Sequence, residues 1–170
     1  MQHIIKSYIN FLFHSKNEHG VHSPFVYNLI TKSFHTPNFK IQTEAQTKNK
    51  LILKTIQYLS LKECVCFDAH QKINTPIDAL IVSNTHFKHF SMDAILPFCK
   101  NETCLFIENI HKKKENEIFW KSLYKHKQIT CSIETYNLGM LFVRKEQKKE
   151  HFIINPNKTI SSYLFERIRF

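Results

Sequence analysis

The stretch of sequence that decides the fold is IDALIVSNTHFKHFSMDAILPFCKNETCLFIEN, residues 77–109. It opens with an apolar run at 77–82 and closes with a second at 103–107, and both resemble strands that are buried on two faces. The residues between them, around 87–98, have apolar side chains at helical spacing. A strand, a helix and a strand in this order predict an α/β protein with parallel strand pairing.

The residues that follow predict a C-terminal antiparallel pair beside this parallel core. Strand candidates lie at 129–135 and 140–144. The Asn137-Leu138-Gly139 turn between them is typical of an antiparallel hairpin. The other elements expected in this half are a charged amphipathic helix at about 113–126, a short apolar segment at 151–154 and a last helix at 159–168.

Helical patterns dominate the residues that precede the sheet. Residues 2–14 have apolar side chains at helical spacing, and Gly20 is expected to end this helix from the left-handed C′ position. Ser23 followed by Pro24 is typical of the N-cap and first position of a second helix, which runs to about Phe34. The later elements expected here are a third helix from Lys48 to about Leu59 and a short apolar strand at 64–67.

These patterns divide one globular unit into three parts. Residues 1–35 form an N-terminal helical extension, 45–154 the α/β core and 155–170 a C-terminal tail. A chain of 170 residues with 42% hydrophobic side chains can bury a core without a disulfide or metal. The tail is expected to pack over an edge of the sheet.

Glycine is scarce, and this scarcity excludes whole classes of phosphate-binding site. The chain has only two glycines, Gly20 and Gly139. A P-loop or a G-x-G-x-x-G fingerprint needs several glycines within a few residues, because only glycine lets the backbone approach the phosphates so closely. Neither motif can exist in this sequence.

The charge is basic, but no recognition motif accompanies it. The formal net charge is +10, and only three of the 24 basic residues are arginine, the residue favoured for base readout. No specific nucleic-acid partner is therefore expected. Weak, salt-sensitive attraction to RNA or anionic lipid leaves open a basic RNA- or membrane-surface-associated module.

The cysteines and histidines predict no metal site. The five cysteines contain no C-x-x-C pair, and the eleven histidines complete neither a zinc-finger spacing nor an H-E-x-x-H motif. Buried free thiols are expected instead. No apolar run reaches the length of a membrane span and the N-terminus lacks a signal-peptide h-region, so the expected location is the cytoplasm.

Polar side chains follow each predicted parallel strand. In open α/β sheets the ligand crevice lies outside the carboxyl ends of the strands, so these side chains are candidates for a site. The alternative is that they are ordinary strand-end and helix-cap residues. The candidates are Asp68, Ser83, Asn84, His86, Glu108, Asn109 and His111.

Four segments resemble a bacterial family of class I S-adenosylmethionine-dependent, O-methyltransferase-like proteins. HGVHSPFVY at 19–27 resembles the H-G-V-H-S-P-F-V motif of the family's N-terminal helical region, and IDALIVSNTH at 77–86 its fourth strand. LPFCKNETCLFIENIHK at 96–112 resembles the segment that ends in F-D-D-I-H-W, and SIETYNLGMLFVRKEQKKEHFII at 132–154 the closing strands. The resemblance implies a Rossmann-like methyltransferase sheet.

The sequence departs from this family where the methyl donor would bind. The family has a glycine-rich E-L-G-x-x-x-G loop after its first strand, whereas here the strand at 64–67 runs into Asp68 and the next recognisable strand soon follows. The fold expected is therefore a truncated form of the methyltransferase sheet. The family's carboxylates correspond to Ser83 and to the pair Glu108-Asn109, which leaves too few anionic oxygens for a divalent cation.

The first function predicted is a degenerate methyltransferase-like protein that acts by binding, with a homologous protein subunit as partner and no cofactor. The alternative is an active enzyme that binds S-adenosylmethionine with an atypical loop. Glu108 would then orient the substrate, His111 would act as base and Asp68 would be the candidate cofactor contact. A gene product without selected function also stays open. The substrate or partner surface is expected to include His19, His22, Ser23, Asn84, His86 and Asn109.

Overall fold

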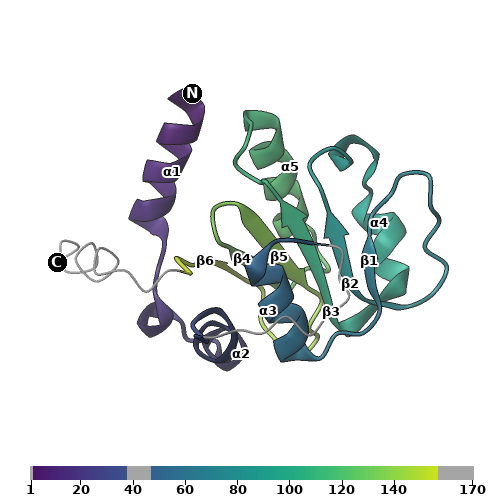
Figure 1. The fold of residues 1–170 in the computed structure, drawn as a ribbon, viewed down its shortest axis with the longest axis horizontal. Coiled ribbons are helices and arrows are strands. Elements are labelled where there is room, and N and C mark those ends of the chain that lie inside the picture. Colours follow the sequence, from purple (N-terminus) through teal and green to yellow (C-terminus); the bar gives the residue numbers. More distant parts are fainter. Residues whose placement is uncertain (1, 38–46, 157–170) are drawn as a thin grey trace.

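A six-stranded mixed sheet organises the residues that the computed structural model describes, 2–37 and 47–156 (Figure 1). The strand order is β1-β2-β3-β5-β4-β6. Strands β1, β2 and β3 are parallel, β5 runs antiparallel between β3 and β4, and β6 is parallel to β4. The strands are β1 Cys64–Cys66, β2 Ile77–Val82, β3 Cys99–Glu108, β4 Cys131–Glu134, β5 Leu138–Phe142 and β6 Glu150–Ile153.

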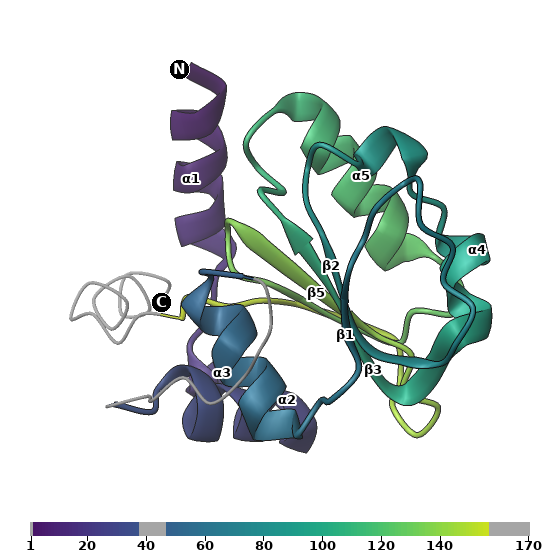
Figure 2. The same cartoon turned by 45° about the vertical axis from the view of Figure 1, so that its right-hand side comes forward.

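Helices cover both faces of the sheet, α2 and α3 on one face and α4 and α5 on the other (Figures 1 and 2). Helix α1 stands beside the sheet, at the end that carries β6. These helices confirm the predicted α/β class and the helical region before the sheet. Their bounds are α1 Gln2–His14, α2 Pro24–Leu29, α3 Lys50–Leu59, α4 Met92–Ile95 and α5 Lys114–Lys125, with a π-turn at Ile30–Phe34 after α2.

The apolar runs of the central strands are continuous because both of their faces are buried. Ile81 and Phe106 pack on the side of α2 and α3, whereas Leu80 and Leu105 pack on the side of α4 and α5. All four side chains are buried. Successive strand residues point to opposite faces, so a strand between two helical layers needs an apolar residue at every position.

The start of α2 agrees with the sequence, but the end of α1 does not. Ser23 caps α2, and its Oγ accepts a hydrogen bond from the amide of Val26 at 3.4 Å. The prediction that Gly20 ends the first helix is wrong, because α1 stops at His14 and no glycine has a positive φ. After His14 the chain becomes extended and pairs with the end of β6. The amide of Lys16 donates to the carbonyl of Ile153 at 2.8 Å.

The role predicted for Gly139 in the hairpin turn is also wrong. Strands β4 and β5 are antiparallel as predicted, but the residue with positive φ in the turn is Tyr136, at 65°. Gly139 lies buried within β5 beneath the indole ring of Trp120. Glycine is needed there for close packing rather than for a turn.

The single helix predicted at 87–98 is broken into three short pieces. These are 3₁₀ turns at Phe87–His89 and Leu96–Phe98, with α4 between them. The break before α4 falls at Phe90, whose backbone is extended. Pro97 lies in the second 3₁₀ turn and has no amide hydrogen to donate, so it cannot continue the hydrogen bonding of α4.

The cysteines are free thiols, but their expected burial holds only in part. Cys104 and Cys131 are buried, Cys64 and Cys99 are half-buried and Cys66 is exposed. Cys66 is exposed because β1 is the edge strand of the sheet. The predicted helix at 159–168 and most of the tail lie outside the described residues. No helix within 2–37 or 47–156 is long and apolar enough to cross a membrane.

Candidate functional site

The carboxyl ends of β2 and β3 bring Asn84 and Asn109 together, as the sequence predicts for one edge of a parallel sheet. Nδ2 of Asn109 donates to Oδ1 of Asn84 at 3.1 Å. Asn109 has a φ of 58°, a conformation that asparagine tolerates better than most residues. Its carbonyl accepts from Nδ2 of Asn116 at 2.8 Å, and its amide donates to the carbonyl of Asn137 at 2.6 Å. Asn109 therefore forms a tightly bonded corner between β3, α5 and the hairpin.

The other polar groups at this edge also bond locally. The hydroxyls of Ser83 and Thr85 lie 2.5 Å apart. Oδ1 of Asp68 accepts from the backbone amide of His70 at 2.9 Å, which closes a turn directly after β1. The His86 ring packs edge-on against Phe67, with centroids 6.1 Å apart. These contacts fit the alternative in which strand-end residues serve mainly to shape their own turns.

Glu108 and His111 face different partners. Partial burial, together with the nearby Glu108 carboxylate, raises the pKa of the Cys66 thiol, so Glu108 lies towards β1. Burial raises the pKa of Glu108 itself. Both ring nitrogens of His111 are occupied elsewhere: Nδ1 lies 2.7 Å from Oε1 of Glu117, and Nε2 lies 2.8 Å from Oε1 of Glu134. The predicted orienter and base therefore do not form a bonded pair.

His111 is held between two carboxylates and against an aromatic ring. Burial favours the neutral imidazole, but the hydrogen bonds to Glu134 and Glu117 outweigh it and raise the pKa of His111 above its ordinary value. The ring also stacks on Tyr136, with centroids 5.1 Å apart and planes 11° from parallel. Such a clamp fixes the orientation of the ring and favours its charged form.

Glu134 is the centre of a polar network that also includes His111, Glu117, Trp120 and His151. Its side chain is 9% exposed, and Oε2 accepts from Nε1 of Trp120 at 2.6 Å and lies 3.6 Å from Nε2 of His151. Burial favours protonation, but the hydrogen bonds from His111, His151 and Trp120 prevail and lower the pKa of Glu134 to about 2. Nδ1 of His151 lies 2.8 Å from Oγ of Ser132. A fully bonded buried carboxylate of this kind is charged at neutral pH.

Sequence reasoning missed Glu117, Glu134 and His151 as members of a cluster. They come from α5, β4 and β6, which are not consecutive, so no local spacing brings them together. One signal was present: Ser132 and Glu134 alternate with apolar residues along β4, although all four residues of that strand are buried. Buried polar residues with period two indicate that one face of a strand meets polar partners.

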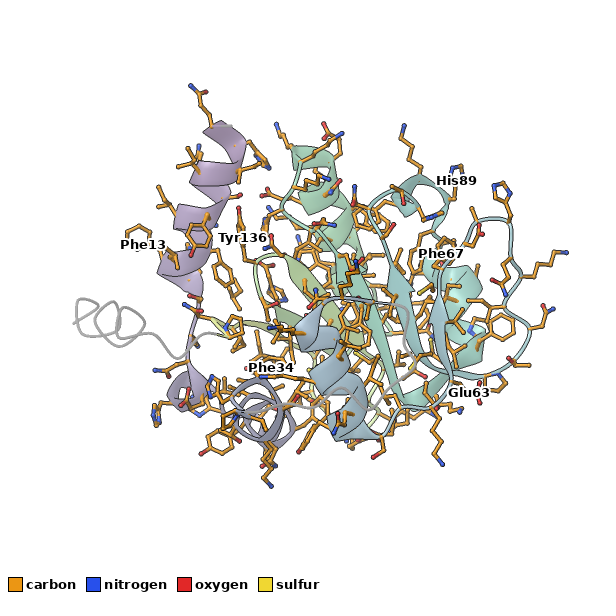
Figure 3. All side chains as sticks on the ribbon, in the orientation of Figure 1. Phe13, Phe34, Glu63, Phe67, His89 and Tyr136 are labelled. Carbon is orange, nitrogen blue, oxygen red and sulfur yellow. The ribbon has the colours of Figure 1, made fainter. Side chains whose placement is uncertain are left out.

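A cavity of about 490 Å³ opens beside the network, between α1 and α5. The network supplies part of its wall through His111, Glu134 and His151, and α1 supplies another part. Helix α1 is held here by Tyr136, whose hydroxyl donates to the carbonyl of Ile4 at 3.0 Å. In Figure 3, Tyr136 points towards α1, whereas the exposed Phe13 lies on the opposite side of that helix.

The N-terminal motif and the C-terminal loop are packed against each other. Nε2 of Gln147 donates to Oγ of Ser23 at 3.1 Å, and the Arg144 guanidinium lies 4.2 Å from the centroid of Phe25. Ser23 is buried, whereas the predicted surface residues His19 and His22 are exposed. The structure thus brings together the two segments on which the family resemblance most depends.

The described residues include no group of three or more His, Cys, Asp or Glu side chains placed to hold a metal ion. Within the network, the carboxylates and imidazoles face one another. Asp68, the candidate cofactor contact, is engaged in the turn after β1. No protein-family model matches the chain, and neither the curated proteins nor the solved structures contain a significant match to it.

Proposed function

We propose that this chain is a truncated methyltransferase-like protein that acts by binding and does not transfer methyl groups. The observation that carries the proposal is the connection that follows β1, the edge strand of the sheet. Residues 67–76 alone connect β1 to its parallel neighbour β2, and they contain no glycine. The turn at Asp68 bonds to its own backbone, through His70 and Gln71. A donor site of the family's type needs a glycine loop at this position.

The arrangement of the strands supports kinship with the family. The resemblance implies a parallel core followed by C-terminal antiparallel strands. The sheet has parallel β1, β2 and β3, with β5 antiparallel to its neighbours on both sides. A shared fold carries no activity by itself, so this support concerns ancestry alone.

The residues at the strand ends support the loss of chemistry. A hard divalent cation is held by several anionic oxygens. Ser83 and Asn109 stand where the resemblance implies carboxylates, and both are bonded to neighbouring side chains. Glu108 is left as the one carboxylate among these three positions.

Calorimetric titration of the purified chain with S-adenosylmethionine and with S-adenosylhomocysteine tests the proposal. We expect no heat of binding from a folded sample. A Kd tighter than about 100 µM would overturn the proposal and make the active enzyme the leading function. In that case Glu108→Gln, which changes a half-buried carboxyl at the carboxyl end of β3, should slow methyl transfer.

The partner proposed is a homologous methyltransferase subunit that retains the glycine loop. The surface proposed for it is the junction of 19–27 with the loop at 144–150, where His22 is exposed. Co-expression of the two proteins should give a complex that His22→Asp weakens. His70→Asp, an exposed histidine after β1, is the matched control and should leave the complex intact. If both variants behave alike, this surface is not the interface.

A further inference from the structure

We propose that the cavity between α1 and α5 binds a small organic anion, a flat apolar group that carries a carboxylate. The cavity lies on the α5 side of the sheet, where β4 and β6 form its floor. The proposal does not rest on the proposed function, because the walls contain neither Asp68 nor the turn after β1, although His111 belongs to them. Its volume of about 490 Å³ is within the range of small-molecule sites.

Three lysines from two helices line this cavity. Lys6 lies on α1, and Lys114 and Lys121 lie on α5. Within the described part of the chain, none of the three makes a hydrogen bond or ion pair. Unpaired lysines from two helices that line the same cavity favour an anionic ligand.

The acidic groups in the wall do not cancel this charge. Glu117 lies 2.7 Å from His111 and 3.5 Å from His3, and Glu134 is bonded to His111 and Trp120. Both carboxylates therefore already have cationic or donor partners. The field that a ligand meets at the mouth of the cavity is that of the lysines.

Apart from these charged groups and the polar side chains of Ser7 and Asn10 on α1, much of the wall is aromatic or apolar. It includes Trp120, Tyr124 and Ile153. The Tyr124 ring stacks on His151, with centroids 4.1 Å apart and planes 12° from parallel, and its centroid lies 5.5 Å from that of Trp120. An inorganic ion would leave this wall in contact with water, so the ligand that fills the cavity carries a flat apolar part.

The single tryptophan of the chain, Trp120, is a reporter built into the wall. We expect 3-phenylpropionate to change its fluorescence saturably, with a Kd below about 1 mM. The neutral analogue 3-phenylpropanol and inorganic phosphate should each bind at least about tenfold more weakly. The alcohol lacks the carboxylate that the lysines attract, and phosphate lacks the aromatic ring that packs on the apolar wall. Equal binding of the neutral analogue, or no saturable response to 3-phenylpropionate, would overturn the proposal.

The double variant Lys6→Gln, Lys121→Gln should weaken binding of 3-phenylpropionate by about tenfold. The control is Lys62→Gln, Lys88→Gln, which changes two exposed lysines outside the cavity and should bind as the wild type does. Circular dichroism establishes that both variants are folded. If the cavity variant binds like its control, the lysines do not recognise the ligand and the proposal fails.

A second measurement uses the unaltered protein. Amide chemical-shift changes on addition of 3-phenylpropionate should concentrate at 3–10, 114–124 and 151–153, the three segments that supply most of the wall. Changes that concentrate instead at the strand ends after β1 and β2 would place the ligand elsewhere and overturn the assignment. A failed titration with S-adenosylmethionine would leave this result unaffected.

Discussion

The indole ring of Trp120 occupies the space in which a Cβ atom on residue 139 would lie. A Cβ built on Gly139 falls 2.4 Å from Cζ3 of that ring and 2.6 Å from Cη2. The same indole donates its Nε1 hydrogen to Glu134, so the ring cannot move aside without breaking a buried hydrogen bond. The missing side chain on β5 thus fixes both the packing of α5 and the position of the Glu134 carboxylate.

Gly139→Ala should destabilise the protein by about 1–3 kcal/mol, because overpacking displaces the buried indole. Urea unfolding followed by circular dichroism measures the loss. Gly20→Ala is the matched control, since its nearest contact is the flexible side chain of Lys16, at 2.9 Å, and its φ is not positive. We expect the control to change stability by less than about 0.5 kcal/mol. Equal losses in the two variants would contradict the close packing at Gly139.

Glu134→Gln should lower the free energy of unfolding at pH 6 by about 3 kcal/mol. The variant keeps the shape of the side chain but removes the charge that His111 faces at 2.8 Å. Glu150→Gln, an exposed glutamate on the neighbouring strand β6, is the control and should lie within about 0.5 kcal/mol of the wild type. A wild-type-like urea midpoint for Glu134→Gln would show that the buried charge is not stabilising.

The network should stabilise the fold most in mildly acidic solution. The pKa of Glu134 falls from 4.5 to about 2 on folding, so its contribution is present above pH 4.5 and is lost as the pH falls towards 2. The pKa of His111 rises above 6.5, so its contribution is complete below pH 6.5 and is lost as the pH rises through the folded value.

Urea unfolding midpoints between about pH 6 and about pH 9 measure the part of the pH dependence of stability that comes from His111. The wild type should lose stability over this range. His111→Gln should lose less, because the group that releases its proton is gone. Parallel pH profiles for the two proteins would refute the coupling between His111 and the two carboxylates.

Ser23→Ala should cost about 1 kcal/mol, since Ser23 caps α2 and also accepts a hydrogen bond from Gln147. Ser91→Ala is the control, because Ser91 holds the N-cap position of α4 but its side chain makes no capping hydrogen bond. Thermal unfolding of the two variants compares them directly. If Ser91→Ala is as costly as Ser23→Ala, the capping hydrogen bond is not the cause.

The sequence by itself determined the α/β class and most of the elements that build the sheet. The runs at 77–82 and 103–107 are strands because continuous apolar residues must be buried on both faces, and that requirement is local. The cap at Ser23 and the antiparallel pairing of β4 with β5 were also predictable, because helix caps and hairpins depend on residues that are neighbours in the chain. The meeting of Asn84 with Asn109 followed from parallel pairing of β2 with β3.

Only the tertiary structure decided the partners of His111. Glu117 and Glu134 lie 6 and 23 residues from His111 in the chain, and His151 follows still later. They meet because β5 is inserted between β3 and β4, which places β4 and β6 beneath α5, where Trp120 contacts Glu134 and Tyr124 contacts His151. Gly139 makes the same point, since a packed indole on α5 rather than a turn requires it. Periodicity records which face of an element is buried, but strand order decides what that face meets.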